Sequence, residues 1–234
     1  MSDRTWERLG AASGIVAVLL FAGAFIILLV TDPIGEVPDI ANAPEEAAGY
    51  LSDNETELKV QVLLNSLAIV AFLWFLGSLW STLRAAEGGP ARVSAIASAG
   101  GIAGAALVLM GFVFEASAVV NPAGIQPEDS GLLYVLAAMS IGLGGSAFTV
   151  FFLAAGKVIL KTGALPLAIG LLAFVAAAAS ALGFVSIFVD EGIFNPATGA
   201  FGFWVRFGAF VIWLAAASVT LTATVGARPP RSRR

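Results

Sequence analysis

The chain contains no cysteine and no histidine. Without cysteine it can form no disulfide, iron–sulfur cluster or thiolate zinc site, and it has no cysteine nucleophile. Without histidine it lacks the commonest metal ligand and the usual general base near neutral pH. Any chemistry would therefore depend on carboxylates, lysine, arginine, tyrosine, serine or threonine. The sequence indicates no metal and no cofactor.

Charge is also scarce. Only 12% of the 234 residues are charged, 59% are hydrophobic, and the mean hydropathy is +0.93. A soluble domain has about 45–50% apolar and about 25% charged residues. This composition excludes a soluble globular protein, a disordered chain and a nucleic-acid-binding protein. It indicates a polytopic protein embedded in a lipid bilayer.

Six apolar runs are each about 20 residues long or longer, the length that a helix needs to cross a hydrocarbon core of roughly 30 Å. The runs are hydrophobic on every face, which is typical of membrane spans. They lack the alternation of apolar and polar residues that marks transmembrane strands. The sequence therefore predicts one all-α membrane domain over 1–234, a bundle of six transmembrane helices arranged as three antiparallel hairpins. The predicted spans are 9–30, 60–83, 93–120, 132–155, 165–189 and 201–225.

The segment between the first two spans, 31–57, is predicted to be an acidic extracytoplasmic loop, because it has many carboxylates and no Lys or Arg. Within it, Pro44–Leu51 fits a short surface helix, but a solvated loop is the favoured interpretation. Asn54 and Glu57 have the spacing of a capping box, which predicts a helix start just before the second span.

The basic residues are distributed unevenly between the two sides of the predicted membrane. Lys59 and Arg206 lie at or near the side of the acidic loop. The other basic residues lie on the side of the termini: Arg4, Arg8, Arg84, Arg92, Lys157, Lys161, Arg228, Arg231, Arg233 and Arg234. Because cytoplasmic loops are rich in Lys and Arg, both termini are predicted to be cytoplasmic, in the cell (plasma) membrane. Residues 226–234 then form a basic cytoplasmic tail.

Three strongly polar side chains fall inside the predicted spans: Asn65, Glu115 and Arg206. Each is five residues from the outer end of its span. At about 1.5 Å per residue, each lies roughly 7–8 Å below the outer boundary. Gln61 lies one turn above Asn65 on the same helix face. The sequence therefore predicts a buried polar pocket in the outer half of the bundle, formed by Glu115, Arg206, Asn65 and Gln61.

Glu115 follows a glycine-rich stripe of its span, which includes Gly104 and Gly111. Such stripes let helices approach closely, so Glu115 is expected to face the bundle interior. A lone charge at the centre of a bilayer costs about 2.5–3.5 kcal/mol on insertion scales, so pairing is expected. We expect Glu115 and Arg206 to form an ion pair, either directly or through water. Two alternatives stay open: the pair only joins two helices, or Arg206 extends outward to the headgroups.

Two stretches carry a resemblance to known proteins. They are Tyr50–Lys59, with the sequence YLSDNETELK, and Trp80–Arg92, with the sequence WSTLRAAEGGPAR. Together with the long acidic first loop, they resemble the six-span actinobacterial integral membrane proteins classified as a domain of unknown function. The resemblance implies a bacterial inner membrane and six helices. It implies no catalytic or binding residues.

Three classes of function remain. The favoured one is a non-enzymatic structural, accessory or regulatory membrane protein, which could assemble as a homo-oligomer or with a membrane-complex partner. The alternative is a small-solute transporter or channel that uses the outer polar pocket, although the inner halves of the spans are nearly all apolar. A second alternative is an intramembrane enzyme acting on a lipid or isoprenoid, with Glu115 as acid or base. That enzyme would need a roomy cavity at Glu115.

Overall fold

The computed structural model describes residues 3–31, 37–120 and 124–227. Over these residues the chain is all-helical, and six helices are long and apolar enough to cross a membrane. This confirms the prediction of an all-α chain with six candidate spans. The basic residues at 228–234 and the first acids of the predicted loop, Asp32 and Glu36, lie outside the described residues. The α-helices are α1 (Asp3–Thr31), α2 (Ala43–Asp53), α3 (Glu55–Glu87), α4 (Arg92–Val120), α5 (Pro127–Thr162), α6 (Leu167–Ala181) and α7 (Val205–Ala227).

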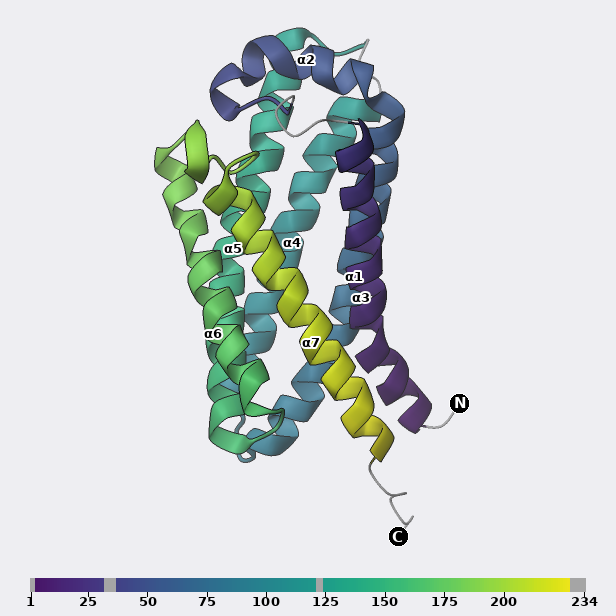
Figure 1. Cartoon of the computed structure of the whole chain (residues 1–234), viewed down its shortest axis with the longest axis vertical. Helices are drawn as coiled ribbons and strands as arrows, with labels where there is room; N and C mark the ends of the chain where they lie inside the picture. Colours follow the sequence, from purple (N-terminus) through teal and green to yellow (C-terminus); the bar gives the residue numbers. More distant parts are fainter. Residues whose placement is uncertain (1–2, 32–36, 121–123, 228–234) are drawn as a thin grey trace.

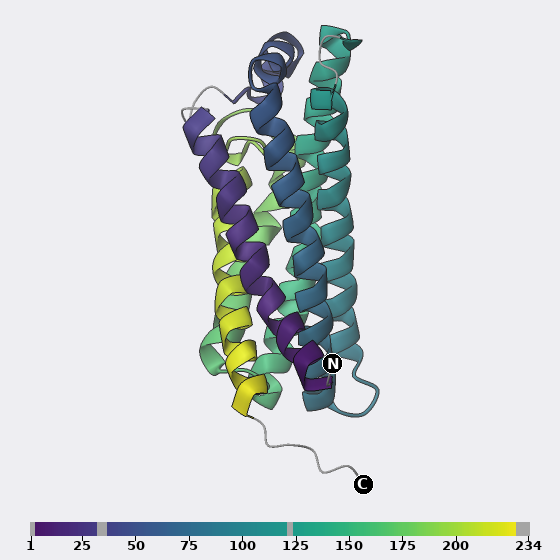
Figure 2. The ribbon, with the colours of Figure 1, turned by 90° about the vertical axis from the view of Figure 1, so that its right-hand side faces the viewer.

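The six long helices form a closed ring. Each packs on the next in the order α1, α3, α4, α5, α6 and α7, and α7 packs back on α1 (Figure 1, Figure 2). The described parts of α1 and α7 that lead to the two chain ends lie at one end of the bundle, which we call the terminal end (Figure 1). The short helix α2 lies across the opposite end, where it packs mainly on α5. We call this opposite end the roof.

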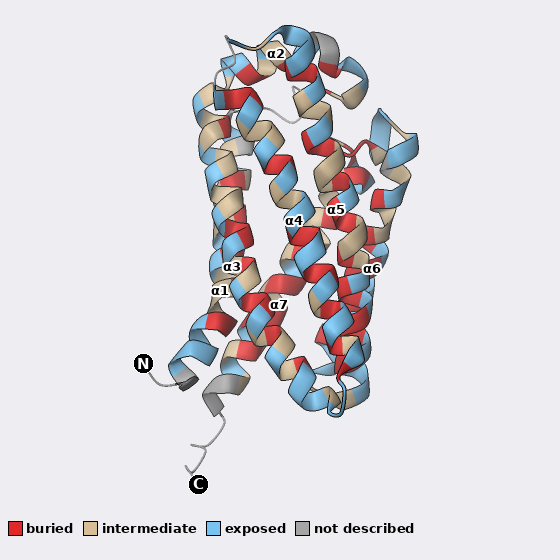
Figure 3. Cartoon of the chain, turned by 180° about the vertical axis from the view of Figure 1, so that it is seen from behind, coloured by how far each residue is buried: buried red, intermediate tan, exposed pale blue. Residues whose placement is uncertain are grey.

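Close approach of helix backbones depends on glycine where α4 meets α5. A Cβ built on Gly100 would lie 2.7 Å from the backbone nitrogen of Phe151, so a larger residue would separate the two helices. The carbonyl oxygen of Gly104 lies against Gly144 in the same way. Because lipid offers no hydrophobic drive for helices to associate, such tight van der Waals contact stabilises the bundle. Figure 3 shows buried residues on the sides of helices that face their neighbours.

An aromatic cluster fills the middle of the bundle and the part toward the terminal end. Its rings are buried, and neighbouring ring centroids lie between 4.9 and 6.5 Å apart. The Trp213 indole nitrogen donates to the carbonyl oxygen of Ile169 at 3.1 Å, so its polar atom is satisfied. The bundle is therefore solid at this level. The cluster consists of Phe72, Phe75, Phe148, Phe151, Phe152, Phe210 and Trp213.

The segment predicted to be a solvated loop is partly helical, so that interpretation is wrong for residues 43–53. Helix α2 forms there because it buries Ala43, Ala47 and Leu51 against the roof ends of α3, α4 and α5. The predicted capping box is also wrong. The Asn54 side chain makes no cap; its amide donates back to the carbonyl oxygen of Tyr50 at 3.0 Å.

The last two spans contain irregular backbone that their apolar composition does not predict. The fifth span was predicted as 165–189, but α6 ends at Ala181 and a 3-10 stretch, η3 (Leu182–Phe188), follows. After the short turn η4 (Gly192–Phe194), the sixth span begins with a π-helical turn, η5 (Ala200–Trp204), before α7. Irregular backbone at membrane depth is tolerated where protein covers it or where it lines a cavity.

Candidate functional site

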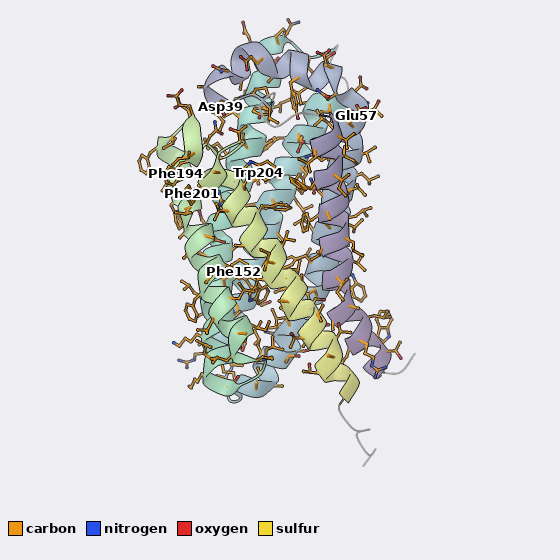
Figure 4. The ribbon with its side chains drawn as sticks, viewed as in Figure 1. Asp39, Glu57, Phe152, Phe194, Phe201 and Trp204 are labelled. Atoms are coloured by element: carbon orange, nitrogen blue, oxygen red, sulfur yellow. The ribbon has the colours of Figure 1, made fainter. Side chains whose placement is uncertain are left out.

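A cavity of about 540 Å³ occupies the roof half of the bundle. Side chains of α1, α3, α4, α5 and α7 form its walls, and the segment from Val37 to Leu51 forms its roof. Phe148 and Phe210 of the aromatic cluster also line it and close it toward the terminal end. In Figure 4, Asp39 and Trp204, which line the cavity, lie nearer the roof than Phe152 of the aromatic cluster.

All four residues of the predicted polar pocket line this cavity. Gln61 and Asn65 come from α3, Glu115 from α4 and Arg206 from α7. The walls between them are largely apolar and aromatic. The structure thus brings residues from three different helices to one space, and their functional role remains a prediction.

Glu115 and Arg206 form no direct ion pair, so the direct form of the predicted contact is wrong. Within the described part of the chain, one salt bridge is found, between Lys59 and Glu55, and Glu115 makes no hydrogen bond or ion pair. The Arg206 guanidinium donates to two backbone carbonyl oxygens: Nη1 to Gly202 at 2.6 Å and Nη2 to Gly142 at 2.5 Å. It is 8% exposed, so it does not extend outward to the headgroups as one alternative proposed.

Glycines make room for the Arg206 side chain. A Cβ on Gly145 of α5 would overlap the guanidinium, and a Cβ on Gly183 would lie 2.8 Å from its central carbon. Gly183 belongs to the 3-10 stretch that follows α6, and Gly202 belongs to the π-helical turn. The irregular ends of the last two spans therefore supply two sides of the guanidinium site. We call Gly142, Gly145, Gly183 and Gly202 the arginine seat.

The seat leaves part of the guanidinium unsatisfied. The Arg206 Nε is buried and has no hydrogen-bond partner among the described residues. Carbonyl dipoles stabilise a cation, but they carry no net charge that would neutralise it. The cavity wall therefore holds a fixed, positively charged donor group.

A hydrogen-bonded clasp holds the roof over the cavity. The Asp39 carboxylate accepts from the Asn195 side-chain amide at 2.9 Å and from the Thr198 hydroxyl at 2.5 Å. Asn195 is fully buried, and its amide also donates to the carbonyl oxygen of Asp190 at 2.7 Å. The Tyr134 hydroxyl donates to the carbonyl oxygen of Pro38 at 2.6 Å. We call Asp39, Asn195 and Thr198 the roof clasp.

The roof clasp and the arginine seat are the parts of the site that sequence reasoning missed. Asp39 was one of many loop acids, and Asn195 lies in a short connection that hydropathy does not distinguish. The glycines of the seat resemble ordinary packing glycines. The one signal for the arginine seat in the sequence was the buried arginine itself, because a buried charge needs hydrogen-bond partners.

Within the described part of the chain, no group of three or more Asp and Glu side chains could hold a metal ion. No protein-family model, curated protein or solved structure matches the chain.

Proposed function

We propose that the chain is a non-enzymatic, multi-pass membrane protein that binds one amphipathic small molecule in the roof-half cavity. The observation that carries this proposal is a cavity of about 540 Å³ whose largely apolar wall includes the seated cation of Arg206. Ligand sites in proteins are typically mostly apolar cavities of about 300–1,000 Å³ with a few well-placed polar groups. Such a binding protein fits an accessory or regulatory role.

The charge distribution supports an orientation with both termini in the cytoplasm. Arg84, Arg92, Lys157 and Lys161 lie at the terminal end, near the end of α3, at the start of α4 and near the end of α5. The roof end carries the acids of α2 and of the first turns of α3 and α5. This matches the excess of Lys and Arg in cytoplasmic loops. The cavity would then lie in the outer half of the plasma membrane.

The two alternatives fit the cavity less well. A transporter or channel needs a polar route that continues to the terminal end, and the aromatic cluster fills that part of the bundle. An enzyme acting on a lipid gains one supporting feature, because Glu115 lies unpaired in a roomy cavity. A substitution of Glu115→Gln that abolished turnover of a lipid while leaving binding intact would favour the enzyme.

Native mass spectrometry of the full-length protein, extracted from its own membrane with mild detergent, tests the proposal. We expect a bound species of drug-like size on the unaltered protein. Ala138→Phe adds a ring at a cavity-lining position and should remove this species. Ala106→Phe adds the same ring at an exposed position of α4 outside the lining and should retain it.

Two outcomes would contradict the proposal. One is an unaltered protein that carries no bound species under conditions that preserve its fold. The other is a bound species that Ala138→Phe retains as fully as Ala106→Phe does, because that species would then lie outside the cavity.

A further inference from the structure

We infer that the occupant of the cavity is an acidic single-chain amphiphile, whose oxyanion head accepts hydrogen bonds from Arg206 and whose hydrocarbon chain lies along the aromatic walls. This inference rests on the proposed function, because it names the chemical class of the molecule that the cavity binds. The acidic head can be a carboxylate or a phosphate monoester, because both offer oxyanion acceptors to a guanidinium.

The positive charge of the Arg206 guanidinium is permanent. A guanidinium keeps its proton in proteins and has five N–H donors, of which the structure shows two engaged by the carbonyl oxygens of Gly202 and Gly142. No carboxylate among the described residues lies within ion-pair distance of it. A buried cation without an anionic partner is costly, so an anion in the cavity would stabilise it.

Arg206 and Glu115 differ in whether their side chains can become neutral. Both line the cavity, and they do not bond each other. The carboxyl of Glu115 can take up a proton and become neutral, whereas the guanidinium cannot lose one. The cavity therefore keeps the positive charge of Arg206 even when Glu115 is neutral.

The charges of the lining place the head group at Arg206 rather than at the roof. Arg206 is the one basic residue in the cavity lining that the structure describes, and the charged lining residues near the roof, Asp39 and Glu46, are acidic. An oxyanion near the roof would meet like charge. At the seat it meets a cation whose position the surrounding glycines and carbonyls fix.

The rest of the ligand lies along the aromatic walls. Aromatic side chains line the cavity on several helices, among them Phe21 and Phe25 of α1, Phe112 of α4 and Phe207 of α7. Such walls favour a hydrocarbon chain over a polar solute. A cavity of about 540 Å³ has the size for one drug-sized molecule, which favours one chain over the two chains of a phospholipid.

The test measures binding of brominated single-chain amphiphiles to the full-length protein in lipid nanodiscs. Bromine quenches tryptophan fluorescence at short range, and Trp204 lines the cavity. Three probes share one brominated chain and differ in the head: a carboxylate, a phosphate monoester and an uncharged alcohol. We expect one or both acidic probes to bind about tenfold or more tightly than the alcohol. The comparison of the two acidic probes identifies the head. Trp204→Phe should remove most of the saturable quenching.

Two variants test whether Arg206 provides the preference. Arg206→Gln should weaken the acidic probes to the level of the alcohol and leave alcohol binding unchanged. Gly145→Ala keeps the charge but displaces the guanidinium, so it should reduce the same preference even where Arg206→Gln does not fold. Gly208 lies on the same helix as Arg206, and a Cβ at position 208 meets no atom within 4 Å. The Gly208→Ala variant should therefore bind all three probes as the unaltered protein does.

The outcomes separate this inference from the proposed function. If all three probes bind equally and Ala138→Phe blocks them, the cavity binds amphiphiles but the acidic head is wrong. If no probe gives saturable quenching that depends on Trp204, both the acidic head and the binding function are wrong. An acid preference that survives both Arg206→Gln and Gly145→Ala would overturn the role of Arg206.

Discussion

Arg206 shows how a single buried charge imposes constraints on distant parts of the chain. On insertion scales an arginine at the middle of a membrane helix costs about 2.5–3.5 kcal/mol. Here two carbonyl oxygens, one from α5 and one from the π-helical turn, accept from it. Hydrogen bonds to charged groups contribute more than neutral ones. Glycine at 145 and 183 then follows from space alone, because a side chain there would displace the guanidinium.

Replacing Gly145 with alanine should destabilise the folded protein. The new methyl group overlaps the guanidinium, so the hydrogen bond from Arg206 to Gly142 should weaken or break. The loss of one hydrogen bond to a charged group costs about 1.5–3 kcal/mol, which exceeds the roughly 1 kcal/mol that alanine gains over glycine in a helix. The midpoint of thermal unfolding in detergent should therefore fall.

Gly208→Ala is the matched control for that measurement. The substitution is the same, it lies two residues from Arg206, and its Cβ meets no atom within 4 Å. Its unfolding midpoint should stay the same or rise, because only the helix preference changes. Equal midpoints for the two variants would mean that the seat contributes nothing to stability.

At this scale, counting residues from the span ends places Glu115, Arg206 and Asn65 at one depth, and the structure has all three lining one cavity. The same counting did not give the direct hydrogen-bond partners of Arg206. The depth of a residue in the bilayer does not say in which direction its side chain points around the helix axis. It also does not say which backbone carbonyl groups an irregular turn leaves free to accept hydrogen bonds. The carbonyl oxygens of Gly142 and Gly202 were therefore invisible to an argument based on side chains.

At the scale of elements, the roof is held by residues far apart in the sequence. Asp39 precedes α2, whereas Asn195 and Thr198 lie between η4 and η5. The clasp therefore joins the connection after α1 to the connection before α7, above the cavity. Asn195 uses both its amide hydrogens and its side-chain carbonyl oxygen, so this buried side chain is fully satisfied within the half-buried clasp.

Asp39→Ala should loosen the roof and leave the bundle folded. It removes the acceptor for Asn195 and Thr198, and leaving buried donors unsatisfied costs about 1–3 kcal/mol. Hydrogen exchange followed by mass spectrometry should show faster exchange in α2 and in residues 190–204, with no change in the aromatic cluster. Asp53→Ala, an exposed acid on α2, is the control. Equal exchange in the two variants would show that the clasp does not hold the roof.

The elements that the sequence did not predict have a common cause. Hydropathy measures how apolar a segment is, and the 3-10 stretch after α6 is as apolar as the helix before it. A Cβ on Gly183 would lie 2.7 Å from the Gly142 carbonyl oxygen of α5 and 2.8 Å from the Arg206 guanidinium, so the surroundings of this stretch come from other parts of the chain. Helix α2 was ambiguous for the same reason, because its stability comes from burying three small or apolar residues on the roof ends of other helices.

At the scale of the whole molecule, the bundle has a solid half and a hollow half. Aromatic rings fill the region toward the terminal end, and the cavity occupies the region under the roof. The six spans were predictable because the length and hydropathy of a segment show directly whether it can cross a bilayer as a helix. The polar residues of the hollow half were predictable from their depth, but the size of the cavity was not. Apolar residues that fill a core and apolar residues that line a cavity look the same in a sequence.

The membrane orientation can be tested with single cysteines, because the natural chain has none to remove. Ser52→Cys lies exposed on α2 at the roof end, and Ala86→Cys lies exposed near the end of α3 at the terminal end. Since basic residues gather at the terminal end, that end should be cytoplasmic. A membrane-impermeant maleimide added to intact cells should therefore label Ser52→Cys and leave Ala86→Cys unlabelled. Both should react equally after detergent solubilisation, which controls for accessibility. Labelling of Ala86→Cys alone in intact cells would reverse the orientation and place the cavity in the inner half of the membrane.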